Sequence, residues 1–292
     1  MQPAPQLAPY AQTAEIREPG ARIHYFEAGQ RDKPALILIH GLQDEADTWR
    51  HVFEPLARTH RVISLDLPGF GRSDKARRAY SVPLYARAVL SFMDALKIGH
   101  AGLIGNSLGA MVAETIALTH PARASRLVLV DGTVCIVEWP AAAPGGLVQW
   151  LLMPIYDRRY FESLRRSTSA AYDSLRPYYA DLDGLPQEDR DFLFRRVNER
   201  VWDERQRLAS LAVRMRLLPF VAFQARRLVR RIPASPVPTT VVWGAEDRIL
   251  PIGNGMARAA LQPAARFVRI AGAGHLPHQE RAEEFLKALG NR

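Results

Sequence analysis

The chain has 292 residues, of which 48% are hydrophobic and 24% are charged. This composition is typical of a folded globular protein with one or two domains, and it excludes a disordered, collagen-like or coiled-coil chain. The single cysteine, Cys135, excludes an internal disulfide and a cysteine-based metal cluster. The first six residues have no basic start and no unbroken apolar stretch behind them, which predicts a cytoplasmic protein without a secretory signal.

The net charge of +9 comes almost entirely from arginine, because lysine occupies only four positions. The arginines are interleaved with acidic residues, a pattern typical of solvated helix faces, so we expect no nucleic-acid partner. The segment Trp139 to Tyr156 has no charged residue and approaches the length of a membrane span. Its prolines, including Pro154, and its glycines break such a helix, so we expect no stable membrane insertion.

Short apolar runs alternate with helix-like stretches in the first part of the chain. The apolar runs are residues 35–39, 62–65, 103–104 and 127–130, and the helix-like stretches are 84–96 and 111–118. Apolar runs without polar alternation suit strands that are buried on both faces, and their alternation with helices predicts an α/β fold with a parallel sheet.

The pattern changes after residue 133. From 134 to 232 the apolar residues take helical spacing only, which predicts an all-helical insertion. A proline-rich connector at 233–238 ends it. Strand-like runs then return at 239–243 and 267–270, and 282–289 forms a closing helix. We therefore expect a core of residues 1–133 and 233–292 with an insertion of residues 134–232.

Residues 105–109 read Gly-Asn-Ser-Leu-Gly, a Gly-x-Ser-x-Gly motif between a strand run and a helix-like stretch. This strand–turn–helix context is what a nucleophile elbow requires, and the glycines permit the tight turn that exposes Ser107. A serine hydroxyl needs a base and a group that orients the base. Asp247 and His275 follow in the loops after the last two strand runs, so they are the candidates for these roles.

Together these motifs resemble the α/β-hydrolase fold with a helical cap. The order Ser107, Asp247, His275 is the one that fold uses. Residues 40–42, His-Gly-Leu, match the family's oxyanion loop, and residues 66–73 match its Asp-x-Pro-Gly-x-Gly-x-Ser turn. The resemblance covers residues 23–289 and implies a mostly parallel eight-stranded sheet flanked by helices, with the cap formed by the insertion.

The resemblance implies a catalytic role for five residues. Ser107 would attack an acyl carbonyl, His275 would move the proton, and Asp247 would orient the imidazole. The backbone N–H groups of Leu42 and Leu108 would hold the oxyanion, with Gln43 as the alternative to Leu42. No metal and no organic cofactor is implied, because these groups all belong to the protein.

Five other residues have competing interpretations. Asp131 ends a strand run where some relatives place the triad acid, so it is the alternative to Asp247. We interpret Glu246 as a loop charge and His278 as a residue that holds the loop of the catalytic histidine. His40 is expected to be a hydrogen-bonded structural residue beneath the oxyanion loop. Cys135 is expected to be a small residue at the hinge of the insertion, since no basic cluster flanks it.

These features predict a serine hydrolase that cleaves small to medium, hydrophobic carboxylic esters as a monomer or a dimer. Relatives of this fold that are haloalkane dehalogenases or epoxide hydrolases use aspartate where this chain has Ser107. The first alternative is a carbon–carbon bond hydrolase of ring-fission products, because the Gly-Asn-Ser elbow is similar, although Leu276 stands where those enzymes usually have tryptophan. A lipase, an amidase or a non-catalytic ligand-sensing protein of the same fold are further alternatives.

Overall fold

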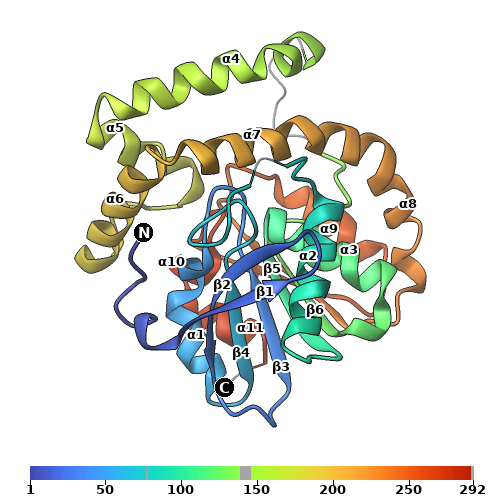
Figure 1. The fold of residues 1–292 in the computed structure, drawn as a ribbon. Helices are drawn as coiled ribbons and strands as arrows, with labels where there is room; N and C mark the ends of the chain where they lie inside the picture. Colours follow the sequence, from blue (N-terminus) through green and yellow to red (C-terminus); the bar gives the residue numbers. More distant parts are fainter. Residues whose placement is uncertain (77, 139–145, 291–292) are drawn as a thin grey trace.

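The computed structural model describes residues 1–76, 78–138 and 146–290 (Figure 1). An eight-stranded sheet in the order β1-β2-β4-β3-β5-β6-β7-β8 forms its centre. Its strands are Ala11–Ile16, Ala21–Ala28, Ala35–Ile39, Arg61–Leu65, Ala101–Asn106, Ala124–Val130, Thr239–Gly244 and Arg266–Ile270, numbered β1 to β8. The β1–β2 and β2–β4 pairs are antiparallel and the other pairs are parallel, which confirms the predicted α/β fold.

The central strands lack polar alternation because both faces of the sheet are buried. Ile37 and Ile39 of β3 belong to one apolar cluster, whereas Leu36 and Leu38 of the same strand belong to another. Successive side chains of a strand point to opposite faces, so the two clusters are the two sides of the sheet. Helices α2 (Val82–Ala95), α3 (Leu108–Thr119) and α9 (Ile252–Ala260) cover the first side. Helices α1 (Arg50–Ala57), α10 (Pro277–Glu280) and α11 (Ala282–Ala288) cover the second.

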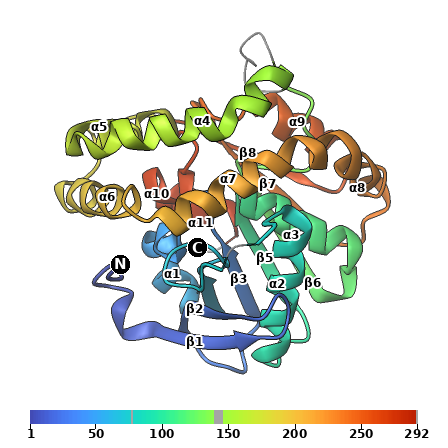
Figure 2. The ribbon, with the colours of Figure 1, turned by 45° about the horizontal axis from the view of Figure 1, so that its top comes forward.

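Helices fill the chain between β6 and β7, and no strand occurs there among the described residues. They are α4 (Gly146–Arg165), α5 (Thr168–Asp173), α6 (Gln187–Arg200), α7 (Glu204–Pro219), a π-helical turn (Phe220–Ala225) and α8 (Arg226–Val229). Figures 1 and 2 show α4 and α7 lying across the end of the sheet. The predicted boundaries of the insertion stay a prediction.

The structure of the uncharged segment, residues 139–156, differs in part from expectation. Residues 139–145 lie outside the described residues, but α4 continues through Pro154, which was expected to break a helix. Pro154 is exposed, so water can satisfy the carbonyl that loses its helical donor, which explains why the helix tolerates the proline.

One helical stretch among the described residues, Glu204–Ala234, is long and apolar enough by composition to cross a membrane, and 28% of its most apolar window is buried. It comprises α7, the π-helical turn and α8. Ala209 and Val213 on its inner side belong to the apolar core, as expected for a helix packed on a globular domain.

Candidate active site

Ser107 stands at a strained turn between β5 and α3. Its φ of 53° and ψ of −113° lie outside the regions that non-glycine residues ordinarily adopt. A side chain at Gly105 would collide with the backbone of Gly109, and one at Gly109 would collide with the carbonyl of Ile39. Both motif glycines are therefore required by the close approach of backbone segments around the serine.

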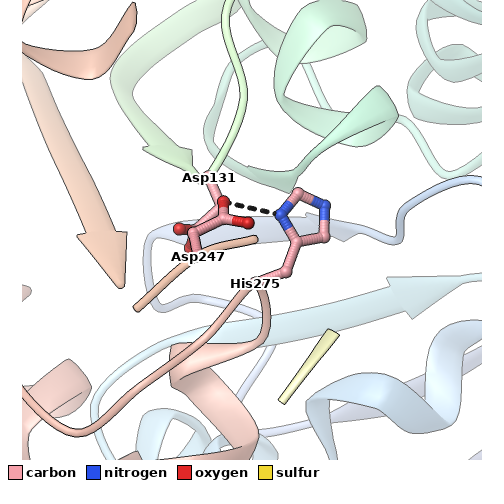
Figure 3. A group of neighbouring side chains, drawn as sticks. All are labelled: Asp131, Asp247 and His275. Atoms are coloured by element: carbon pink, nitrogen blue, oxygen red, sulfur yellow. Dashed lines mark hydrogen bonds and ion pairs between the residues drawn. The ribbon is translucent and has the colours of Figure 1, made fainter. Parts of the chain in front are cut away.

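His275 and Asp247 form a hydrogen-bonded pair beside the elbow (Figure 3). The distance from His275 Nδ1 to Asp247 Oδ2 is 2.8 Å. The other carboxylate oxygen of Asp247 accepts the backbone N–H groups of Ile249 at 2.7 Å and Leu250 at 3.1 Å. Because the carboxylate accepts the proton of Nδ1, the Nε2 atom of neutral His275 carries the free lone pair.

Ser107 and His275 line the same cavity, which has a volume of about 810 Å³. Within the described chain, the hydroxyl of Ser107 makes no hydrogen bond with the imidazole. Such contacts are often long without substrate and tighten when it binds, so the arrangement is compatible with proton transfer. The structure thus brings together the three residues that were predicted from separate segments.

The predicted oxyanion loop lies against the elbow, where Gly41 approaches Ser107. No described group accepts a hydrogen bond from the backbone N–H of Leu42 or Leu108. His40 is buried beneath this loop: its Nε2 accepts the N–H of Leu67 at 2.9 Å, and its Nδ1 lies 2.6 Å from the carbonyl oxygen of Gly41. These contacts agree with a structural role for His40.

Gln43, the alternative donor, has a φ of 62° and donates its side-chain amide to the Ser210 hydroxyl at 2.8 Å. Its side chain thus ties the oxyanion loop to α7. The choice between the N–H groups of Leu42 and Gln43 stays a prediction.

Asp131 lies next to Asp247 at the end of β6, and Figure 3 shows both carboxylates on one side of the His275 ring. Its Oδ1 accepts the N–H of Gly244 at 2.8 Å. Burial, followed by the charge of Asp247, raises the pKa of Asp131 well above its ordinary value, which favours the neutral carboxyl. The hydrogen bond of His275 goes to Asp247. The geometry therefore favours Asp247 over Asp131 as the orienting acid.

Three ligand atoms, one each from Asp131, Asp247 and His275, lie within 4.8 Å of one another, a spacing that a metal ion can also use. The hydrogen bonds of Asp131 with Gly244 and of His275 with Asp247 engage this group without a metal. The bond between Asp247 and His275 therefore fits the orienting role that was predicted for Asp247.

Glu246 is exposed in the loop after β7, as expected of a loop charge, and its carboxylate accepts the backbone N–H of Ala273 at 3.0 Å, which anchors the loop that carries His275. His278 is buried 3.0 Å from the Thr48 hydroxyl, and its ring lies 4.1 Å from that of Trp49. Burial, followed by the charge of a nearby arginine, lowers the pKa of His278 well below its ordinary value, which keeps the ring neutral.

Cys135 is buried, as expected of a small structural residue, and its backbone N–H donates to the Thr133 hydroxyl. Burial raises the pKa of its thiol, with a smaller contribution from Glu114, so the thiolate needed for nucleophilic chemistry is disfavoured.

Two functional positions were missed in the sequence. The side-chain amide of Asn106 donates to the backbone carbonyl of His275 at 3.0 Å, so it connects the elbow directly to the histidine loop. Glu280 accepts the N–H of Gly274 at 2.6 Å and that of Ala180 at 2.7 Å, which connects the same loop to the insertion. The position of Asn106 beside Ser107 was an available signal, whereas Glu280 shows no motif.

Ion pairs hold the segment after the oxyanion loop against α6. Arg200 lies 2.7 Å from Asp44 and 2.6 Å from Glu45, and Arg196 lies 2.9 Å from Glu45. Burial alone would raise the pKa of Glu45, but the charges of Arg200 and Arg196 outweigh it and lower the pKa. The insertion is thus fixed electrostatically to the loop that supplies a predicted oxyanion donor.

The cavity has mostly apolar walls supplied by the core and by the insertion. Three arginines also line it, and each is paired: Arg200 as described above, and Arg207 and Arg214 with Asp157 between them. Tyr160 and Leu218 line the cavity as well, although both are exposed, so they mark its mouth between α4 and α7.

Comparisons with known proteins agree with this architecture. An uncharacterized protein of Mycobacterium tuberculosis is 30% identical over 266 residues, covering 87% of this chain and 73% of its own. A 2-hydroxy-6-oxononadienedioate/2-hydroxy-6-oxononatrienedioate hydrolase of Burkholderia vietnamiensis is 29% identical, covering 92% of this chain and 89% of its own.

A solved structure of a bacterial membrane phospholipase A superposes with a TM-score of 0.71 at 26% identity, covering 96% of this chain and 84% of that one. The alpha/beta hydrolase fold family matches residues 34–282, which is most of the chain and includes all five predicted site residues. The chain therefore belongs to the alpha/beta hydrolase fold family.

Proposed function

We propose that this protein is a serine hydrolase that cleaves carboxylic esters with an apolar acyl or alkyl group. The observation that carries the proposal is the meeting in one cavity of the strained Ser107 turn, the hydrogen-bonded His275–Asp247 pair, and the unpaired N–H groups of Leu42 and Leu108. A nucleophile, an oriented base and free backbone donors are the parts that acyl transfer needs.

The reaction follows from the tautomer of neutral His275, in which Nε2 has the free lone pair. The Ser107 oxygen attacks the ester carbonyl carbon while its proton passes to Nε2, and the carbonyl oxygen becomes an oxyanion held by Leu42 and Leu108. The carbon–oxygen bond to the alcohol then breaks, and Nε2 returns the proton to the leaving alkoxide. A water molecule attacks the acyl-serine by the same route, which releases the acid and restores the serine.

The charges in the cavity favour a neutral substrate. The guanidinium groups of Arg200, Arg207 and Arg214 already face carboxylates of the protein, so an anionic substrate would have to compete with Asp157, Asp44 or their neighbours. The apolar walls, in contrast, offer a hydrocarbon chain a large area away from water.

A carbon–carbon bond hydrolase is the second candidate. It is supported by the Burkholderia vietnamiensis relative, whose name describes the hydrolysis of a ring-fission dicarboxylate, and by the Gly-Asn-Ser elbow. The paired arginines and Leu276 count against it. The name of the phospholipase relative points instead to ester cleavage.

The test is hydrolysis of a p-nitrophenyl ester series from acetate to palmitate by the wild type, by Ser107→Ala and by Ser169→Ala, which alters an exposed serine of α5 as the matched control. We expect turnover by the wild type and the control and essentially none by Ser107→Ala, with unchanged thermal midpoints. The same three proteins are tested on 2-hydroxy-6-oxo-6-phenylhexa-2,4-dienoate. Ser107-dependent loss of this dienoate without ester turnover would replace the proposal by the second candidate, and stoichiometric binding without turnover would indicate a ligand sensor.

A further inference from the structure

The outer face of α4 exposes a run of large apolar side chains. Leu151 is 59% exposed, Ile155 51% and Tyr156 55%, and Leu152 is also exposed. The spacing 151, 155 and 152, 156 places them on one side of the helix. Several large exposed apolar groups in succession are unusual for a surface that faces only water, and they indicate an interaction site.

The mouth of the cavity adjoins this face. Tyr160, one turn after Tyr156 on α4, and Leu218 at the end of α7 are both exposed and both line the cavity. Beyond Leu218, Phe223 in the π-helical turn is 75% exposed. Figures 1 and 2 show α4 and α7 together across the end of the sheet, whereas α8 lies along the side of the molecule next to α3. Exposed apolar side chains of α4 and α7 therefore flank the way into the site.

The helical stretch from α7 to α8 carries positive charge that the protein does not neutralise. From Arg205 to Arg231 the sequence has eight arginines and no acidic residue. Two of them, Arg207 and Arg214, are paired with Asp157 inside the insertion. The other six are exposed, and in the part of the chain that the structure describes none has an ion pair: Arg205, Arg216, Arg226, Arg227, Arg230 and Arg231.

We propose that this end of the insertion binds the surface of an anionic lipid bilayer, with the mouth of the cavity at the interface. The docking face comprises Leu151, Leu152, Ile155 and Tyr156 of α4, Leu218 and Phe223, and the exposed arginines Arg205, Arg216, Arg226 and Arg227. Arg231 donates to the carbonyl of Leu118 near the far end of α3, so it and its neighbour Arg230 are not part of this face. Its apolar side chains enter the boundary between headgroups and acyl chains, and the guanidinium groups bind lipid phosphates.

Charge complementarity selects the partner. A second copy of this chain would bring unpaired arginines against unpaired arginines, and a nucleic acid would leave the apolar side chains without a partner. An anionic lipid surface provides partners for both the arginines and the apolar side chains. The helices lie on the membrane in this arrangement and do not span it, and the binding is independent of which bond the enzyme hydrolyses.

The test is co-sedimentation of the full-length protein with vesicles of phosphatidylcholine alone and of phosphatidylcholine with phosphatidylglycerol, at low and at high salt. We expect binding to the anionic vesicles that high salt weakens, and much weaker binding to the neutral ones. Two double variants, Ile155→Ser/Tyr156→Ser and Arg226→Gln/Arg227→Gln, should each reduce the partition coefficient on the order of tenfold.

Matched controls alter similar groups elsewhere. Phe194→Ser removes an exposed aromatic residue from α6, and Arg31→Gln/Arg87→Gln removes two exposed charges outside the docking face. Both controls should bind vesicles like the wild type. Turnover of a soluble ester, or the thermal midpoint if no ester is turned over, shows that each variant is folded.

Equal binding to neutral and anionic vesicles, or unchanged binding of the two docking-face variants, would overturn the proposal. Sedimentation velocity tests whether the face binds a second copy of this chain. A concentration-dependent dimer that Ile155→Ser/Tyr156→Ser abolishes, without vesicle binding, would assign the face to a second copy instead.

Discussion

Replacing Asp247 by asparagine tests which acid orients His275, and the structure determines how the new side chain must lie. One carboxylate oxygen of Asp247 accepts two backbone N–H groups, from Ile249 and Leu250. An amide nitrogen cannot accept these bonds, so the amide oxygen of the asparagine takes this place. Its NH₂ group then points at His275 Nδ1 and donates to it.

This reversal changes the tautomer of the imidazole. Nδ1 must now accept, so neutral His275 carries its proton on Nε2 and cannot take the proton of Ser107. We expect turnover to fall about 10⁴-fold, which corresponds to roughly 5.4 kcal/mol of lost transition-state stabilisation. KM should change little, because the apolar cavity that binds the substrate is untouched.

The assay is steady-state hydrolysis of the best p-nitrophenyl ester near neutral pH, with Asp131→Asn as the matched variant. Burial raises the pKa of Asp131 and so favours its neutral form, and an asparagine oxygen can still accept the N–H of Gly244, so Asp131→Asn should retain activity within several-fold. Greater damage from Asp131→Asn than from Asp247→Asn would refute the assignment and place the acid on β6. Retention of more than about a tenth of the activity by Asp247→Asn would refute the tautomer argument.

Two further predictions concern stability. Glu114→Gln leaves the fully buried guanidinium of Arg258 without its counter-charge, so we expect a loss of about 3–5 kcal/mol in the free energy of unfolding measured with urea. Burial alone would raise the pKa of Asp189, but the hydrogen bond from His51 and the charge of Arg50 outweigh it and lower the pKa to about 2. This folded-state pKa is below the unfolded value near 3.9. The ionised Asp189 therefore stabilises the folded protein above about pH 4, and this contribution is lost as the pH falls toward 2. Asp189→Asn should therefore lower the thermal midpoint at pH 6 and leave it nearly unchanged at pH 2. Because Asp189 is only partly buried, solvent screening limits the loss of stability at pH 6 to about 1 kcal/mol.

Substitutions of exposed carboxylates are the controls for the Glu114 and Asp189 variants. Glu283→Gln, at the exposed start of α11, should leave the urea midpoint within error of the wild type. Asp191→Asn alters an exposed acid two residues from Asp189 and should show the pH dependence of the wild type. If Glu114→Gln cost less than about 1 kcal/mol, the charge pair would be dispensable, and a pH profile of Asp189→Asn parallel to the wild type would contradict the linkage.

The central strands were predictable because burial on both faces leaves continuous apolar runs, as in β3 and β6. The runs did not reveal β1 and β2. Strand β1 lies at the edge of the sheet with most of its residues exposed, and β2 carries Arg22, His24 and Glu27. Their polar residues hide them from a search for apolar runs, and only the family resemblance implied eight strands.

The residues of the candidate site were likewise predictable only in part. Ser107, Asp247 and His275 follow strands, and the carboxyl ends of parallel strands meet at one edge of a sheet, so their order along the chain was informative. The contacts of Asn106 and Glu280 connect segments that are distant in the sequence. Only the position of Asn106 beside Ser107 was a local signal. Nothing local marks Glu280, because a polar side chain at its position is interpreted as a solvated one.

The arginines show most clearly what composition leaves open. In the sequence Arg200, Arg214 and Arg226 look alike, and the net charge counts them equally. In the fold, Arg200 and Arg214 face buried carboxylates, whereas Arg226 and its exposed neighbours have no counter-charge in the described chain. The positive excess is therefore displayed outside the cavity and largely cancelled inside it. A protein of this charge distribution can attract an anionic surface while its site accepts an uncharged substrate, which links the two proposals through one physical cause.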